Sequence, residues 1–138
     1  MEDRILSTIF FYDEDKKILL QGRKSISKFG EEWGPFGGSV EPGEFHKDAI
    51  VREVKEELNY DLKDFRLLNH YNQYVENLDG SRIHLFESVY VSVFPGFDRI
   101  SVMEGDSACL FRIDNARKLK VQSLYLKIFD DLEDCIKP

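Results

Sequence analysis

One segment, between Gly38 and Tyr60, constrains the fold more than any other, because it sets acidic and apolar side chains on opposite sides of one helix. Three carboxylates, Glu53, Glu56 and Glu57, stand at positions i, i+3 and i+4, so on a helix they form one acidic ridge. Apolar side chains recur on the other side, at Ile50, Val54 and Leu58. The segment therefore predicts a helix that packs on a core by one side and carries charge on the other.

The acidic ridge needs a compensating charge, because like charges at these spacings cost a helix a few tenths of a kcal/mol per pair, roughly. Carboxylates without His or Cys favour a hard divalent ion, Mg²⁺ or in its place Mn²⁺. Arg52 lies beside Glu56 on the helical wheel and can reach back to Glu44, which would hold the ridge in place. A solvated acidic surface is the simpler alternative for such a face.

The residues in front of the helix favour a binding site over a solvated surface. Gly37 and Gly38 precede a turn at Glu41-Pro42-Gly43, and the helix is expected to begin near Glu44. A flexible backbone that leads directly into a helix N-terminus lets main-chain groups approach a ligand or a metal.

This segment resembles the Nudix box, in which a glycine, a glutamate, an Arg-Glu pair and a Glu-Glu pair keep a set spacing. The matching residues here are Gly38, Glu44, Arg52, Glu53, Val54, Glu56 and Glu57. Asn59 stands where the family has glycine, and Tyr60 stands where it usually has an aliphatic residue. Asn tolerates the left-handed conformation that ends a helix, so neither departure is a strong objection.

The resemblance implies a single Nudix hydrolase domain over residues 1–138, folded as an α/β/α sandwich with a mixed β-sheet. It also implies hydrolysis of a nucleoside diphosphate linked to another moiety. Glu53, Glu56 and Glu57, with the carbonyl of Gly38, would bind one or more Mg²⁺ ions that bridge the diphosphate. Glu53 or Glu57 would accept the proton of the attacking water.

Residues outside the box supply weaker candidates. Many relatives add a carboxylate from a later loop, for which Glu104 is the first candidate, with Asp106 and Glu87 behind it. Arg23, at the end of a predicted strand, could bind phosphate oxygens, although a strand-end arginine is often only solvated. Trp33 and Phe36 could stack on a base, with core packing as the alternative for Phe36.

Charge and composition limit the partners and the compartment. A net charge of −7 argues against a nucleic-acid polymer as the ligand, whereas a bound metal would still allow a small phosphorylated substrate. The first residues lack a signal peptide's basic start and no apolar run approaches a membrane span, so we expect a cytoplasmic protein. Cys109 and Cys135 are then reduced structural thiols, and His46, His70 and His84 are ordinary polar residues.

The remaining pattern predicts further elements. A hairpin joins strands over 4–12 and 17–23, and a glycine-rich stretch over 29–38 leads to a helix over about 46–58. Strands follow over 65–75, 83–94 and 108–113, with both faces of the second covered. Asp114 is expected to cap a short helix over 115–119. The last helix, over about 123–136, should bury Leu124, Ile128, Leu132 and Cys135 or Ile136.

Three functions fit the resemblance. The first is an Mg²⁺-dependent hydrolase of a small nucleotide, a nucleoside triphosphate, oxidised or not, or a nucleotide sugar. The second is a module that senses a nucleotide without cleaving it, although such a module has no need to keep a costly cluster of carboxylates. The third is an isomerase of prenyl diphosphates, which would need a reactive cysteine that neither Cys109 nor Cys135 suggests. Relatives of this size are often homodimers, and the sequence leaves both substrate and oligomeric state open.

Overall fold

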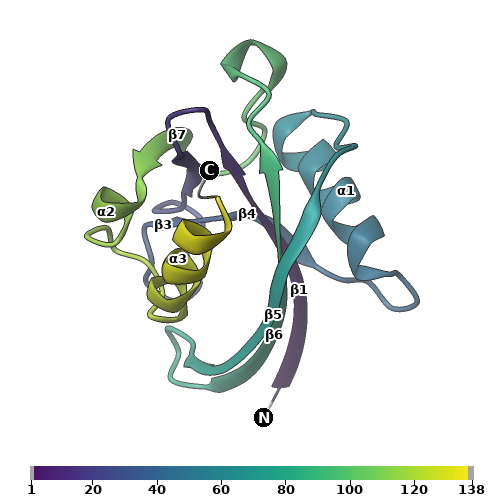
Figure 1. Ribbon diagram of the computed structural model, residues 1–138. Helices are drawn as coiled ribbons and strands as arrows, with labels where there is room; N and C mark the ends of the chain where they lie inside the picture. The colour runs from purple at the N-terminus through teal and green to yellow at the C-terminus, as the bar shows by residue number, and fades with distance from the viewer. Residues whose placement is uncertain (1, 137–138) are drawn as a thin grey trace.

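The computed structural model describes residues 2–136, which form strands and helices in three layers (Figure 1). The strands are β1 (Glu2–Tyr12), β2 (Lys17–Gly22), β3 (Trp33–Gly34), β4 (Phe36–Ser39), β5 (Arg66–Glu76), β6 (Arg82–Val93) and β7 (Ser107–Arg112). The helices are α1 (His46–Leu58), α2 (Ile113–Ala116) and α3 (Leu124–Cys135), with a 3₁₀ turn at Phe97–Arg99.

The seven strands form one mixed sheet with the order β3-β2-β1-β6-β5. Strand β1 runs parallel to β6 over its whole length, from Glu2 opposite Ile83 to Tyr12 opposite Val93. Strand β4 joins β1 and strand β7 joins β2, both antiparallel. The predicted mixed sheet is therefore confirmed.

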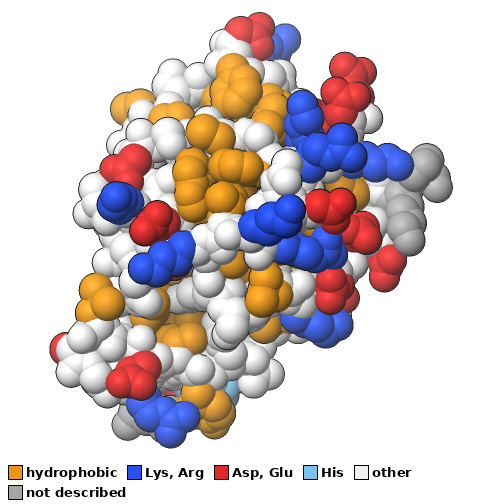
Figure 2. All heavy atoms as spheres, turned by 90° about the vertical axis from the view of Figure 1, so that its left-hand side faces the viewer, with side chains coloured by type: hydrophobic (Ala, Val, Ile, Leu, Met, Phe, Trp, Pro, Cys, Tyr) orange, Lys and Arg blue, Asp and Glu red, His pale blue; other side chains and the backbone are white. Residues whose placement is uncertain are grey.

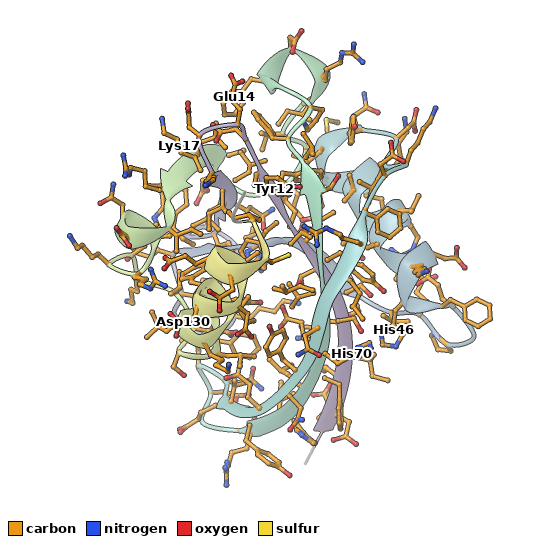
Figure 3. The ribbon with its side chains drawn as sticks, in the orientation of Figure 1. Tyr12, Glu14, Lys17, His46, His70 and Asp130 are labelled. Carbon is orange, nitrogen blue, oxygen red and sulfur yellow. The ribbon has the colours of Figure 1, made fainter. Side chains whose placement is uncertain are left out.

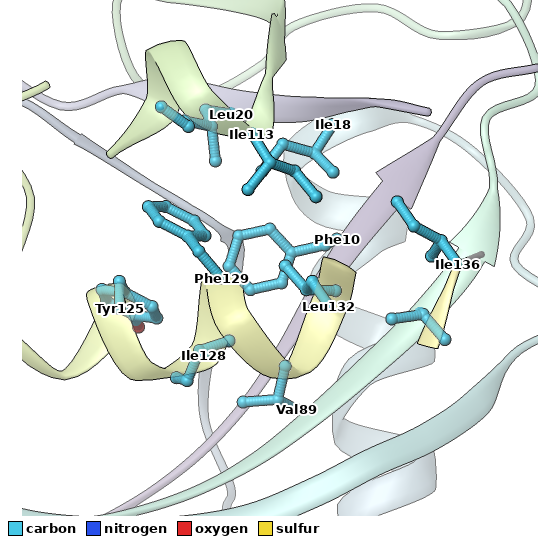
Figure 4. Packing of buried hydrophobic residues seen from close by; sticks show 12 residues of the cluster. Phe10, Ile18, Leu20, Val89, Ile113, Tyr125, Ile128, Phe129, Leu132 and Ile136 are labelled. Carbon is cyan, nitrogen blue, oxygen red and sulfur yellow. The ribbon is translucent and has the colours of Figure 1, made fainter. Parts of the chain in front are cut away.

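Helices cover both faces of this sheet, and each face has its own hydrophobic core (Figure 1). On one face α1 buries Ile50, Val54 and Leu58 against Ile9 and Phe36. On the other, α3 packs Ile128, Phe129 and Leu132 around Phe10 and Val89 (Figure 4). The α/β/α sandwich is confirmed, because residues that alternate along β1 face opposite cores.

The largest departure from the predicted elements lies in the glycine-rich stretch, where two short strands replace the expected loop. Strand β4 pairs with β1, with Gly37 opposite Thr8. A Cβ added at Gly37 would lie 2.2 Å from the carbonyl oxygen of Ser7, so glycine is needed for this close pairing. Glycines in a short strand carry no β-propensity signal, which is why the pattern did not predict it.

The short helix was also misplaced. Helix α2 begins at Ile113, so Asp114 lies in its first turn and is not its N-cap, and Arg112 precedes the helix. The carboxylate of Asp114 instead pairs with Arg117, one turn further on. The expectation that β6 is covered on both faces holds for Val89, Tyr90 and Val91 but is wrong for Val93, which is 64% exposed.

On the face of the molecule beside α2 and α3, hydrophobic side chains gather near the middle, and acidic and basic side chains lie around them (Figure 2). Within residues 2–136, no helix is long and apolar enough to cross a membrane.

Candidate active site

A cleft of about 320 Å³ connects the acidic end of α1 with the face of the sheet below α3. Its walls combine four carboxylates, three glycines, cations and apolar side chains. The sequence-predicted residues among them are Arg23, Trp33, Gly38, Glu53, Glu57 and Glu104. Folding therefore brings residues from four separate stretches of the chain to one cavity.

Gly38 makes room for the carboxylate of Glu53. A Cβ at this position would lie 2.6 Å from Oε1 and 2.7 Å from Oε2 of Glu53, closer than real Cβ contacts allow. Burial raises the pKa of Glu53, and the nearby charges of Glu56 and Glu104 add to that rise. The absence of a side chain at Gly38 thus lets the carboxylate of Glu53 lie directly against the backbone of β4.

Glu57 is the most buried carboxylate of the box, with 1% of its surface exposed. The backbone N–H of Gly37 donates to its Oε1 at 2.8 Å, and the side-chain amide of Gln21 donates to its Oε2 at 3.1 Å. Burial nevertheless raises its pKa to about 8, with repulsion from Glu104 and Glu53 as further causes. These negative charges are close enough to favour either protons or a cation.

Arg52 ties the start of α1 to the loop before it. Its Nε and Nη2 donate to the two oxygens of Glu44, each at 2.9 Å, in a two-pronged contact. Its remaining donors reach the carbonyl oxygen of Ser39 at 2.9 Å and Oε1 of Glu53 at 3.0 Å. The Arg52 guanidinium lowers the pKa of Glu44 to about 2. Arg52 therefore fixes both the loop and the carboxylate of Glu53.

Glu56 differs from its two neighbours on the ridge. Its side chain is 58% exposed and is paired with Arg52 at 3.4 Å. It is not among the residues that line the cleft, whereas Glu53 and Glu57 are. The ridge thus holds one buried carboxylate, one partly buried and one at the surface.

Glu104 comes to the cleft on a loop that is tied to α1 and β2. The N–H of Met103 donates to the carbonyl oxygen of Glu57 at 2.7 Å, and Gln21 donates to the carbonyl oxygen of Glu104 at 3.2 Å. Asp106 faces away from this group, because its carboxylate accepts from Ser25. Gln21 thus connects Glu57 to Glu104, a role that no local sequence signal indicates.

Of the residues predicted to bind the substrate, two line the cleft and one lies in the core. Arg23 lines the cleft, where its Nε donates to Glu31 at 3.3 Å and its Nη1 to Gln21. Trp33 also lines it and packs edge-on against Phe111. Phe36 has no exposed surface and packs in the core under α1, so its apolar ring serves the core and not the cleft.

Glu87 occupies a place that the sequence did not indicate. It is 2% exposed and projects from β6 on the α3 face, where its Oε2 accepts hydrogen bonds from Thr8 and Tyr125, both at 2.6 Å. Both of those hydroxyl-bearing residues line the cleft. Burial raises the pKa of Glu87.

The histidines and cysteines lie apart from the cleft's lining. His46 and His70, on α1 and β5, lie near each other, and each ring bonds to the hydroxyl of Ser88, at 2.6 and 2.9 Å (Figure 3). Cys109 and Cys135 are free thiols, both partly buried.

The donor chemistry at α1 fits a hard divalent cation. Glu53, Glu57 and Glu104 offer only oxygen, and their mutual repulsion would be relieved by a positive ion. Within residues 2–136, no three His, Cys, Asp or Glu side chains already converge as a metal-binding group. The fit therefore rests on the type and charge of the donors and not on a preformed cage.

Comparisons with known proteins agree with this geometry. A family model described as the NUDIX domain matches residues 4–132. The CTP pyrophosphohydrolase of Escherichia coli (strain K12) is 46% identical over 46 residues, a segment that covers 33% of this chain and 34% of that protein.

Solved structures match over nearly the whole chain. The MutT NUDIX hydrolase from Burkholderia pseudomallei is 26% identical, covers 96% of this chain and 98% of its own, and superposes with a TM-score of 0.71. The NUDIX domain of Shewanella oneidensis NrtR, in a complex with ADP ribose, is 12% identical, covers 99% and 90%, and gives 0.75. At that lower identity the likeness shows the fold alone.

Proposed function

This chain belongs to the Nudix family, and we propose that it is a pyrophosphohydrolase that cleaves the diphosphate linkage of a small nucleotide. Its residues 1–138 act as one such domain. The relatives support this assignment, because one is a CTP pyrophosphohydrolase and another a MutT NUDIX hydrolase. The aligned segment spans about a third of the first, so its activity does not transfer by similarity alone.

One observation carries the proposal: Glu53, Glu57 and Glu104 line one cleft beside Gly38, where an added Cβ would collide with Glu53. A solvated acidic surface would not bury Glu57 to 1% exposure or dedicate a backbone N–H and a side-chain amide to it. Burying carboxylates together is costly, so a function that uses the charge is the better explanation.

Glu53, Glu57 and the carbonyl of Gly38 would hold Mg²⁺, with Glu104 beside them and Glu56 at the rim. Bound there, the metal would neutralise the diphosphate charge and would acidify a water molecule. Arg52 keeps Glu53 in position through the contacts with Glu44 and Ser39.

The chain's own groups then handle the proton and the phosphates. Glu53 or Glu57 accepts the proton of the attacking water, according to which of them is free of metal. Arg23 lies in the same cleft and offers its guanidinium to phosphate oxygens, while Glu31 and Gln21 hold it in place. Trp33 contributes an apolar wall for the base.

A nucleotide-sensing module is the second candidate. The complex of the NrtR NUDIX domain with ADP ribose shows that this fold can hold a nucleotide derivative. A module of that kind would bind nucleotide but release no product.

The deciding experiment measures release of phosphate, pyrophosphate and nucleoside monophosphate from a panel of nucleoside triphosphates and nucleotide sugars with Mg²⁺, alongside Glu57→Gln. We expect turnover in the wild type and a loss of about 100-fold or more in the variant. Glu76→Gln, an exposed acid at the end of β5, serves as the matched control and should keep full activity. Binding of a nucleotide without turnover, or an unchanged rate in Glu57→Gln, would reject the hydrolase.

A further inference from the structure

The cleft changes character between its two ends. Near α1 it offers the carboxylates that would engage a diphosphate through metal. On the α3 face of the sheet its lining includes the apolar side chains of Leu6 and Leu85, beside the hydroxyl-bearing residues Thr8 and Tyr125. Because ligand pockets place flat apolar groups against such walls, the base of a nucleotide belongs at this end.

The two hydroxyls are oriented by one hidden carboxyl group. Thr8 and Tyr125 both donate to Oε2 of Glu87 at 2.6 Å. The other oxygen of Glu87, Oε1, is buried and has no hydrogen-bond partner among the described residues. A carboxylate oxygen only accepts hydrogen bonds, so both hydroxyl protons point at Glu87.

Towards the cleft, the hydroxyls of Thr8 and Tyr125 can therefore only accept hydrogen bonds. A hydroxyl has one proton and two lone pairs, so once its proton is committed it presents lone pairs to the cleft. This holds as long as Oε2 of Glu87 carries no proton, with Glu87 ionised or with its proton on Oε1, because Oε2 accepts in both of these states. Burial and the neighbouring Glu87 raise the pKa of Tyr125, which keeps its proton in place.

We propose that the Thr8–Glu87–Tyr125 wall makes this protein selective for nucleotides whose base carries an exocyclic amino group, with Glu87 as the positioning residue. The inference rests on the proposed function and names the class of its substrate. An amino group donates to the fixed lone pairs of the two hydroxyls. A keto group at the same position presents lone pairs to lone pairs and leaves buried acceptors unpaired, so such a base is rejected.

Two matched pairs of substrates isolate this contact. CTP and UTP differ at position 4 of the pyrimidine, and ATP and ITP differ at position 6 of the purine, in each case by an amino against a keto group. The ring nitrogen beside that group changes with it, from an acceptor in the amino member to an N–H donor in the keto member. In the wild type with Mg²⁺ we expect kcat/KM to favour the amino member of at least one pair by about 10- to 100-fold. A ratio near one in both pairs would overturn the inference.

Glu87→Gln tests the positioning role. The amide nitrogen that it introduces finds no partner at the place of Oε1, so it is favoured at the place of Oε2, where it donates to the hydroxyls. Each hydroxyl is then free to turn its proton into the cleft. We expect the amino-to-keto ratio to fall at least several-fold, towards one. A ratio that stays at the wild-type value would mean that Glu87 is only structural. Because both substrates are measured on one sample, the ratio does not depend on how much of the variant is folded.

Glu76→Gln provides the matched control, since it makes the same change on an exposed side chain. Its ratio should equal that of the wild type. Calorimetric binding of CMP, UMP, AMP and IMP separates this inference from the hydrolase proposal. If no nucleotide is turned over, hydrolysis fails, yet a preference for CMP or AMP that Glu87→Gln removes still supports the selective wall. Equal binding within both pairs, or no binding of any monophosphate, contradicts it.

Discussion

The end of the cleft at α1 and the end at α3 both hold buried carboxyl groups, but the partners of those groups come from different distances along the chain. At α1, Arg52 reaches Glu44 eight residues away, and Gly37 reaches Glu57 across twenty. At α3, Glu87 is held by Thr8 across 79 residues and by Tyr125 across 38.

This difference indicates how each end can vary. Most of the α1 end comes from one continuous stretch, which Gln21 and Glu104 join from elsewhere in the chain. The spacing of that stretch must be kept as a unit if the carboxylates are to stay together. The α3 end is assembled from three elements, and single substitutions there can change hydrogen-bonding character without disturbing the box. We infer that the chemistry and the selectivity of this fold are separable.

The sharpest test of the α1 end compares its two glycines. In Gly38→Ala the new Cβ meets only the flexible carboxylate of Glu53, whereas in Gly37→Ala it meets the backbone of Ser7 and Thr8. We expect Gly38→Ala to remain folded and lose about 100-fold in kcat/KM, because misplacing a reacting group by about 1 Å costs that much.

Gly37→Ala should instead lower the melting temperature strongly, since β4 must shift away from β1. Thermal unfolding measured beside kcat/KM distinguishes the two outcomes. An active Gly38→Ala would show that the close contact with Glu53 is not needed for the reaction.

The buried charge at Glu57 predicts a pH-dependent stability. Its pKa is about 8 in the folded chain against an ordinary 4.5, so between these values the folded state holds a proton that the unfolded state lacks. With EDTA present, the free energy of unfolding should therefore fall as pH rises from about 5 to 8, by up to about 1.4 kcal/mol per pH unit.

Urea unfolding of the wild type and of Glu57→Gln across this range checks the effect. The variant should show a flatter profile, with a residual slope from Glu53 and Glu87, whose pKa values burial raises in the same direction. If the free energy of unfolding had the same slope with pH in both proteins, the pH dependence could not be assigned to Glu57. Mg²⁺ should stabilise the wild type more at pH 8 than at pH 5.5, because it competes with protons.

Arg52→Lys should affect activity more modestly. Lysine keeps the charge but cannot reproduce the two-pronged contact with Glu44 together with the bonds to Ser39 and Glu53. We expect kcat/KM to fall about 10-fold while the helix stays folded, measured by steady-state kinetics and circular dichroism. Lys55→Arg, on the same helix outside the cleft lining, is the control. Wild-type kinetics in Arg52→Lys would mean that the charge alone suffices.

Tyr125→Phe should give the smallest effect and tests the α3 end alone. It removes one hydrogen bond to Glu87 while it keeps the ring against Phe10. We expect a loss of about 1 kcal/mol in unfolding free energy, with hydrolysis retained. Tyr74→Phe, whose ring lies at the surface of β5, should be neutral. A loss of all turnover in Tyr125→Phe would show that the two ends of the cleft are not independent.

Much of the architecture was predictable because its signals are local. Helix α1 begins and ends where the amphipathic pattern places it, at His46 and Leu58, and Asn59 takes the left-handed conformation expected at its end. The misplaced elements had weak local signals. Strand β4 is half glycine, and Asp114 is as acceptable in a first helical turn as at a cap.

The family, helix α1 and the grouping of Gly38, Glu44, Arg52, Glu53 and Glu57 follow from the amino-acid sequence alone, because these residues interact within one stretch and their spacing sets which of them lie together. The packing of the whole chain places Glu56 outside the cleft and Phe36 in the core, and it joins Glu57 to Glu104 through Gln21. It alone brought Thr8 and Tyr125 to Glu87. Such contacts depend on which strands pair and which helix covers them, and the local sequence around each residue does not specify this.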